Sequence, residues 1–212
     1  MPIIVIAHEK GGCGKTTTSL NLVEVLKPDL IIDRDAHNNL SFINNIRSDD
    51  DQLNIVTPEH KADLIAALRQ SEQGKLVFVD CGGFDSDLNR IAIASADLVI
   101  TPANDDLPEL IGLKHFNNTL AEISEEMNTH INTHVLWSRV HHSRTNFSDA
   151  DSFLSNAQHL KRLTSTMPMR KIYPDTMKKH GLGVVAHTSS KYGAAARDMK
   201  ALKTEITHLI NT

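Results

Sequence analysis

Two lysines five residues apart bracket three glycines in the segment AHEKGGCGKTTTSLN, residues Ala7–Asn21. Glycines allow backbone N–H groups to curl around a phosphate, and the start of a following helix adds partial positive charge. Lys15 stands where it can reach the outer phosphates of a nucleotide, and Thr16 where its hydroxyl can bind Mg²⁺. The spacing therefore predicts phosphate binding. Such a loop normally requires one lysine, so Lys10 is an additional one.

The segment departs at one position from the general phosphate-binding pattern G-x-x-x-x-G-K-[ST], because Glu9 stands where that pattern has its first glycine. The remainder follows the pattern, between a strand-like run and a helix-like stretch. We predict that this loop binds a nucleotide through Gly11, Gly12, Cys13, Gly14, Lys15, Thr16 and Thr17.

Apolar runs alternate with helix-like stretches along the whole chain. The strand-like runs are Pro2–Ala7, Leu30–Asp33, Leu76–Asp80, Asp97–Thr101, His134–Ser138 and Arg170–Tyr173. The helix-like stretches are Lys15–Leu26, Pro58–Arg69, Asp87–Ala94, Leu107–Met127, Asp149–Thr164 and Ala194–Leu209. This rhythm predicts an α/β fold with a mostly parallel sheet between helices. Together with the phosphate-binding loop after the first strand, it leads us to expect the three-layer P-loop NTPase fold. With 212 residues, we expect one domain over 1–212.

Three aspartates follow or end these strand-like runs. Asp33 and Asp35 are two residues apart at a strand end, so both are expected to point to one side. One carboxylate can bind a water on Mg²⁺ and the other can orient an attacking water. Asp80 ends an apolar run, and Mg²⁺ usually meets such a carboxylate through water. We predict that Thr16, Asp33 and Asp80 form the metal site.

The charge is unevenly distributed, although the net charge is only −4. Residues 139–203 hold 12 Lys/Arg and 4 Asp/Glu, a balance of +8, and such asymmetry favours contact with a polyanion. The alternative is a solvated basic face without a partner.

Two cysteines make no disulfide framework, and no apolar run is long enough for a membrane span. We see no leader sequence at the N-terminus and expect a cytoplasmic protein.

The loop Lys10–Thr17 resembles that of the ParA/MinD group of deviant Walker ATPases, whose motif is K-G-G-x-G-K-T-T. The similarity extends over most of the chain. LIIDRDAHNNLS (Leu30–Ser41) resembles the switch segment of the group, and LVFVDCGG (Leu76–Gly83) its Walker B strand. ITPANDDLPELIGL (Ile100–Leu113) resembles its strand, proline and following helix, and Gly181–Ile206 its closing segment. The small ParA partition proteins are the most similar members.

The resemblance implies ATP and Mg²⁺ as cofactors and slow ATP hydrolysis. Lys10, Lys15 and Asp35 are the implied catalytic residues: Lys10 reaches the partner's phosphates across a nucleotide-sandwich dimer, and Asp35 orients the attacking water. The group usually has Pro-Gln after this aspartate, whereas Ala36 and His37 stand here.

Contacts to the base are less clearly indicated. The group often has Asn in the strand segment where Ser138 and Arg139 stand here. Arg139, and Pro174 of the segment Tyr173–Asp175, are our candidates for base contacts. Guanine-reading N-K-x-D or T-K-x-D motifs are absent, which favours ATP over GTP.

The function implied is DNA partition. An ATP-bound homodimer would bind non-specific duplex DNA, and a centromere-binding, ParB-like partner would stimulate hydrolysis and release the protein from the nucleoid. The candidate DNA-binding residues are Arg170, Lys171, Lys178, Lys179, Lys191 and Arg197. Lys161 and Arg162, expected on a helix, rank lower. A MinD-like or protein-cargo-positioning ATPase is the alternative, but the last helix has few cations and little aromatic character, so we expect no membrane contact.

Overall fold

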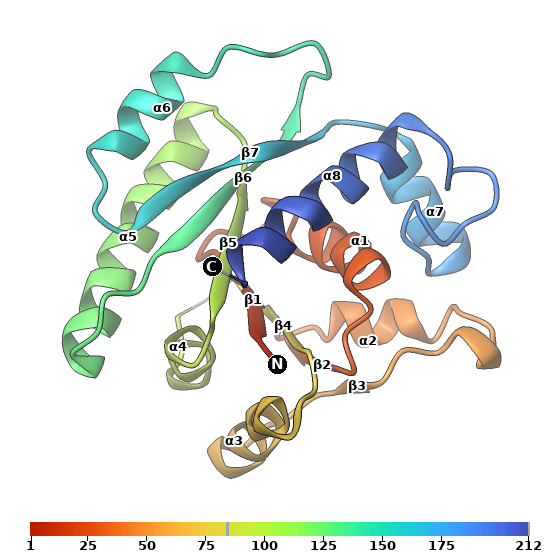
Figure 1. Ribbon diagram of the computed structural model, residues 1–212, viewed down its shortest axis with the longest axis horizontal. Helices are drawn as coiled ribbons and strands as arrows, with labels where there is room; N and C mark the ends of the chain where they lie inside the picture. Colours follow the sequence, from red (N-terminus) through yellow and green to blue (C-terminus); the bar gives the residue numbers. More distant parts are fainter. Residues whose placement is uncertain (84, 212) are drawn as a thin grey trace.

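The chain folds around one seven-stranded sheet with helices on both faces (Figure 1). The computed structural model describes residues 1–83 and 85–211; Phe84, and Thr212 at the end of the expected domain, lie outside the described residues. The strand order is β3-β2-β4-β1-β5-β6-β7, and every described pairing is parallel. The predicted three-layer α/β architecture is confirmed, with β1 at the centre of the sheet.

The bounds of the elements are as follows. The strands are β1 (Ile3–Ile6), β2 (Leu30–Arg34), β3 (Ile55–Val56), β4 (Val77–Cys81), β5 (Leu98–Ala103), β6 (Thr133–Val140) and β7 (Leu160–Pro168). The α-helices are α1 (Lys15–Leu26), α2 (Asn39–Asn44), α3 (Lys61–Leu68), α4 (Asp87–Ala94), α5 (Leu107–Met127), α6 (Ser148–Ser155), α7 (Ile172–His180) and α8 (Ala194–Leu209). Two 3₁₀ turns, η1 (Asp49–Asp51) and η2 (Arg69–Gln73), complete the description.

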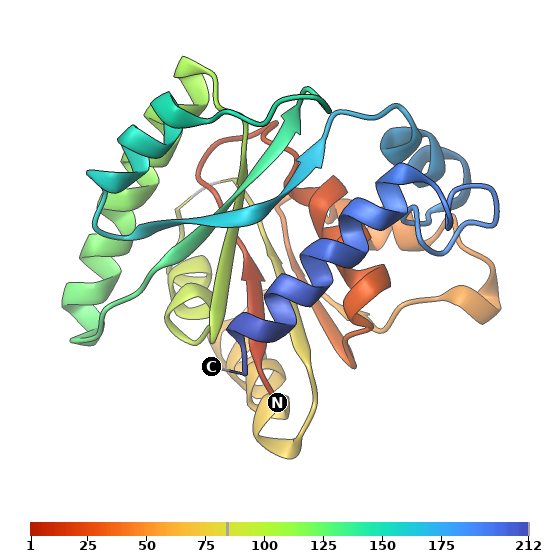
Figure 2. The same cartoon turned by 45° about the horizontal axis from the view of Figure 1, so that its top comes forward.

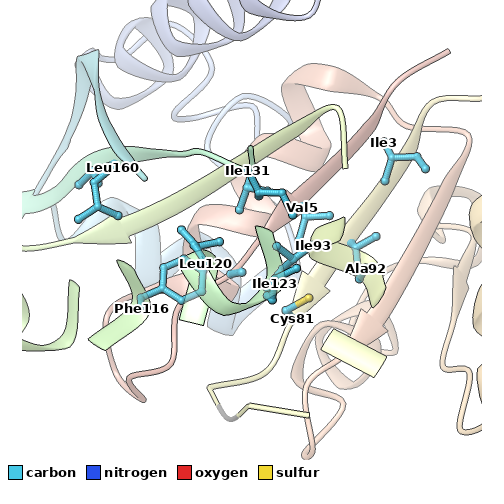
Figure 3. Close-up of a cluster of buried hydrophobic side chains, with 14 of the residues drawn as sticks. Ile3, Val5, Cys81, Ala92, Ile93, Phe116, Leu120, Ile123, Ile131 and Leu160 are labelled. Atoms are coloured by element: carbon cyan, nitrogen blue, oxygen red, sulfur yellow. The ribbon is translucent and has the colours of Figure 1, made fainter. Parts of the chain in front are cut away.

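Alternation along β1 divides the core into two clusters. Ile3 and Val5 point to one face of the sheet, and Ile4 and Ile6 to the other, as the two-residue period of a strand requires. The first face packs against α3, α4, α5 and α6, and Figure 3 shows Phe116 and other α5 side chains among its members. The second face packs against α1, α2, α7 and α8. Burial on both faces explains why these strands read as continuous apolar runs.

The carboxyl ends of the parallel strands meet at one edge of the sheet. β1 lies between β4 and β5, and the chain leaves β1 on a loop that leads directly into α1 (Figure 2). Ligands of open α/β sheets bind at this edge, where successive connections leave to opposite sides. The glycine-lysine loop, Asp33 and Asp80 therefore belong to neighbouring parts of the molecule.

Two sequence predictions between residues 149 and 173 are wrong. The stretch Asp149–Thr164 is not one helix, because α6 ends at Ser155 and the last strand, β7, begins at Leu160. The segment Arg170–Tyr173 is not a strand but leads into α7. Lys161 and Arg162 consequently lie on an edge strand instead of a helix. As neighbours on a strand they still point to opposite sides.

A buried ion pair joins α1 to the loops beyond α2 and α7. Arg47 Nη2 donates to Glu24 Oε1 over 2.6 Å, and both side chains are almost fully buried. Gly181 follows α7 with a positive φ of 65°, and a Cβ there would lie 2.6 Å from the carbonyl oxygen of Ile43 in α2. A glycine is required at 181 for both reasons, and α2 lies in direct contact with the end of α7.

No helix within residues 1–83 and 85–211 has both the length and the apolar character that a bilayer crossing needs.

Candidate functional site

The loop after β1 has the backbone of a phosphate cradle. Gly12 and Gly14 adopt positive φ angles of 80° and 99°, which glycine reaches without strain. Helix α1 begins at Lys15 with no side-chain cap on its first turn. The free N–H groups of that turn, together with the helix dipole, favour an anion in front of the loop. The loop glycines and Cys13 lie between β1 and α1, and Lys15, Thr16 and Thr17 form the first turn of α1.

Lys15 lies folded over this loop. Its Nζ donates to the carbonyl oxygen of Lys10 over 2.8 Å and lies 3.7 Å from Cys13 Sγ. The end of β4 approaches the same point, since a Cβ on Gly83 would lie 3.1 Å from Lys15 Nζ and 3.3 Å from the Gly11 nitrogen. A glycine at 83 leaves the ammonium and the loop room beside the strand end.

Asp80 is a fully buried carboxylate beside the loop. Ser19 Oγ of α1 donates to its Oδ1 over 2.8 Å, whereas Oδ2 has no hydrogen-bond partner among the described residues. Burial raises the pKa of Asp80 to about 7, against the effect of the Ser19 hydrogen bond. Nearby Asp33 raises this pKa further and Lys15 lowers it. An unpartnered buried carboxylate oxygen favours a cation or a cation-bound water.

Asp33 stands opposite Asp80 in the pairing of β2 with β4. It is fully buried and accepts hydrogen bonds from the backbone nitrogen and the hydroxyl of Ser41, each over 2.8 Å. Asp33 thereby fixes the start of α2 relative to the sheet. Its position is compatible with the predicted metal site, but its observed hydrogen bonds go to Ser41 of α2 and to the backbone nitrogen of Asp35.

Asp35 lies beyond the strand end and is partly exposed. Its Oδ1 accepts from the backbone nitrogen of His37 over 2.9 Å and from the side chain of Asn39 over 3.0 Å. The unusual residues Ala36 and His37 are exposed and form the turn that closes on Asp35. The turn is held by bonds to the carboxylate itself, so movement of this segment and reorientation of Asp35 are linked.

Mg²⁺ fits this donor set when phosphate oxygens complete it. Asp80 offers a buried oxygen without a partner among the described residues, and Thr16 lies in the first turn of α1, the helix whose Ser19 binds Asp80. Within residues 1–83 and 85–211, no group of three or more His, Cys, Asp or Glu side chains could hold a metal ion without other ligands. Mg²⁺ is commonly held by one or two protein oxygens together with phosphates and waters.

A cavity of about 440 Å³ adjoins the loop at Gly14 and Thr17. Arg139 and Pro174, both predicted to contact the base, line it together with Met167 and Tyr173. Arg139 has a positive φ of 58°, next to an irregularity in the pairing of β6 with β7. The cavity has the size and mostly apolar lining of a site for a flat heterocycle beside a phosphate loop.

Four of the six predicted DNA-binding residues lie at the corner built by α7, the following loop and the start of α8 (Figure 1). Lys178, Lys179 and Arg197 are exposed there. Lys191 lies over the ring of Tyr192, with its Nζ 5.2 Å from the centroid. Arg170 and Lys171 instead line the cavity, and Arg170 Nε is 3.0 Å from Asp198 Oδ2.

Sequence reasoning missed three side chains that hold the site together. Ser19 and Ser41 bind Asp80 and Asp33, and hydroxyl side chains in such positions give no distinct signal. Glu109 lies in the first turn of α5 and accepts from Lys10 Nζ over 2.8 Å. Its position three residues after the N-cap Asp106 was visible in the sequence, but that spacing indicates a helix start and not a lysine partner.

Comparison with known sequences and structures supports the expected resemblance. Residues 1–74 match the family described as AAA domain. The protein ParA of Rhizobium radiobacter is 30% identical over 107 residues, which are 48% of this chain and 48% of that protein. The match thus spans about half the length of the curated relative.

Solved structures of the ParA/MinD kind share the fold. Apo McdA of Cyanothece superposes with a TM-score of 0.73 at 16% identity, covering 97% of this chain and 99% of that one. The MinC:MinD cell division complex of Aquifex aeolicus gives a TM-score of 0.71 at 15% identity, covering 98% of this chain and 96% of the matched chain. Cobyrinic acid a,c-diamide synthase of Mycobacterium smegmatis, solved with an ATP analogue and magnesium, gives 0.59 at 17% identity over 84% and 93%.

Proposed function

We propose that this chain, which has the fold of the ParA/MinD ATPases, is an ATP-dependent DNA partition ATPase. The observation that supports ATP binding and hydrolysis is the convergence of the two-lysine loop, the three aspartates and the apolar cavity at one sheet edge. The triphosphate would lie on the loop, with Lys15 and the first turn of α1 on its outer phosphates. The base would occupy the cavity at Arg139 and Pro174. Mg²⁺, held by Thr16 and through water by Asp33 and Asp80, would neutralise charge on the phosphates.

Hydrolysis needs a water in line with the outer phosphate and positive charge at the leaving oxygens. Asp35 would orient that water once its bonds to His37 and Asn39 are exchanged. Lys10 would reach the partner's phosphates across the dimer, so that closure and catalysis both depend on the triphosphate. Intrinsic turnover is expected to be slow, and a partner protein would accelerate it.

Removal of the Asp35 carboxylate separates binding from hydrolysis. Asp35→Ala is expected to bind ATP and dimerise, while turnover falls about 100-fold because the water loses its orienting group. Sizing chromatography with ATP, together with phosphate release, measures both effects. Asp33→Asn is the companion variant. Wild-type turnover in Asp35→Ala, with loss of turnover in Asp33→Asn, would move the role to Asp33.

DNA binding by the basic corner is supported by the local charge balance of +8 and by the exposure of Lys178, Lys179 and Arg197. Phosphate contacts alone carry little sequence preference. One subunit offers few such contacts, whereas a dimer that touches about six phosphates should show a log–log salt slope of about −5. Dimerisation with ATP would thereby convert nucleotide state into DNA affinity.

The test is binding of non-specific duplex DNA with ATP, with ADP and without nucleotide, at about 50 and 200 mM salt. The double variant Lys178→Ala/Lys179→Ala is expected to lower the ATP-dependent affinity about tenfold or more and to flatten the salt slope. Lys61→Ala/Lys161→Ala removes the same charge from exposed positions outside the corner and should change little. Equal, weak binding in all nucleotide states would contradict the partition proposal.

If DNA binding does not depend on the nucleotide, a positioning ATPase of the MinD kind is the remaining hypothesis. In this chain the apolar side of α8 is occupied in the core, where Met199, Leu202 and Ile206 are buried. Flotation with vesicles containing anionic lipid, with and without ATP, distinguishes membrane contact from DNA contact.

A further inference from the structure

Lys10 is held by a buried carboxylate of its own subunit. Its Nζ lies 2.8 Å from Glu109 Oε1, and the Glu109 side chain is only 4% exposed, against 35% for Lys10. Glu109 belongs to the first turn of α5, and its backbone nitrogen donates to the N-cap side chain of Asp106. The position of the carboxylate is therefore fixed by the helix, whereas the lysine is the movable partner.

Two further groups face the same carboxylate. Arg139 Nη2 lies 3.6 Å from Oε1, and His8 Nε2 lies 4.0 Å from Oε2. Burial, with Lys15 and Lys10 nearby, lowers the pKa of His8 to about 3, so this ring is neutral and adds no positive charge. Oε2 has no hydrogen-bond partner among the described residues. Lys10 is thus the principal counterion of Glu109, and Arg139 stands at a longer distance.

The pair conflicts with the role proposed for Lys10. A lysine that reaches across a dimer to the partner's phosphates must leave Glu109, and a buried carboxylate without a close cation is strongly unfavourable. Arg139 lies at the same oxygen and at the wall of the nucleotide cavity. It can approach Glu109 when Lys10 departs, and a bound nucleotide is placed to influence its position.

We infer that Glu109 is a latch, a positioning residue that holds Lys10 in its own subunit and thereby opposes dimer closure, so that closure requires the additional binding free energy of the triphosphate. Arg139 replaces Lys10 at the carboxylate when the dimer closes. This inference rests on the proposed function, since it assumes that Lys10 acts in the partner's site. It adds a reason why the monomer does not close without nucleotide.

Glu109→Gln tests the latch, because the amide keeps the shape of the side chain and removes its charge. The symmetric dimer needs the Lys10 side chains of both subunits to be free. If the ion pair leaves each Lys10 free about one-tenth of the time, the protein concentration for half-maximal dimerisation with a non-hydrolysable ATP analogue should fall about 100-fold in Glu109→Gln. Asp151→Asn removes an ion pair with Arg162 far from the loop and should leave dimerisation unchanged. Glu109→Asp retains the charge and should remain close to the wild type. Melting curves establish that the variants fold.

A second measurement needs no dimer. In nucleotide-free monomer, the Lys10 amine should react with an amine-acetylating reagent about tenfold faster in Glu109→Gln than in the wild type, as measured by peptide mass spectrometry. If the wild type dimerises with the analogue, and Glu109→Gln shows the same dimerisation and the same Lys10 labelling as the wild type, the latch is overturned and the proposed function remains intact. Failure of the wild type to dimerise with the analogue would overturn the sandwich mechanism, and the latch with it.

Discussion

Replacement of Lys15 with alanine is expected to abolish ATP binding at ordinary concentrations. Its ammonium lies above the loop, bonded to the carbonyl of Lys10, and is the cation of α1 that can turn to the outer phosphates. Hydrogen bonds to charged groups contribute more than neutral ones, and the loss of those to two phosphates should raise the Kd for ATP about 100-fold or more. Calorimetric titration of ATP in Mg²⁺ buffer measures the change.

Lys203→Ala is the matched control, since it removes the same charge from an exposed position of α8 that does not line the cavity. A Lys15→Ala protein that retained the wild-type Kd would show that the nucleotide does not lie on this loop. Loss of secondary structure in the variant would be visible by circular dichroism and is not expected, because the Lys15 ammonium packs against the loop and not in the apolar core.

Replacement of Lys10 with alanine should leave much of the ATP binding intact and remove ATP-driven dimerisation. Turnover should fall about 1,000-fold, because a cation delivered by a partner to the transferring phosphoryl group contributes on this scale. Chromatography with a non-hydrolysable ATP analogue measures the dimer, and phosphate release measures turnover.

The effect of Lys10→Ala must be separated from the effect on Glu109, which loses its close counterion. The double variant Lys10→Ala/Glu109→Gln removes that buried charge as well. We expect it to regain thermal stability but not dimerisation or turnover. A Lys10→Ala protein that dimerises and hydrolyses ATP as the wild type does would remove the role across the interface.

Most of the fold follows from local patterns in the sequence. The predicted bounds of α1, α4, α5 and α8 are those of the structure, because each has a clear start or stop signal, such as the glycine loop before Lys15 or Asp106 before α5. The short α2 and β3 were not predicted, and two to six residues carry too little periodicity to be recognised.

The error at β7 has a specific physical cause. Leu160, Leu163 and Met167 are buried along this strand, and their spacing of three and four is that of a helix face. Irregular pairing with β6, at Val135/Trp137 and at Ser138/Val140, shifts the register and breaks the two-residue alternation. An edge strand with such irregularities cannot be distinguished from an amphipathic helix by its sequence pattern.

The loop and strand-end aspartates of the candidate site were predictable because each follows an apolar strand. Glu109 was not, because its significance depends on the distance between α5 and the loop, 99 residues apart in the sequence. The assignment of Arg170 and Lys171 to a strand was wrong, whereas their contact with DNA stays a prediction. With α7 in its place, the two side chains line the cavity instead.

The contact between Gly181 and α2 has a mechanical consequence. A Cβ at 181 would lie 2.6 Å from Ile43 and 3.0 Å from Arg47, so the backbone after α7 rests directly on the segment that Asp33 and Ser41 anchor. Close-packed interiors have low compressibility, and a displacement of α2 must be taken up by α7 instead of being absorbed by empty space. A movement of α2, which follows the carboxyl end of β2, would therefore also displace the last turn of α7, where Lys178 and Lys179 lie.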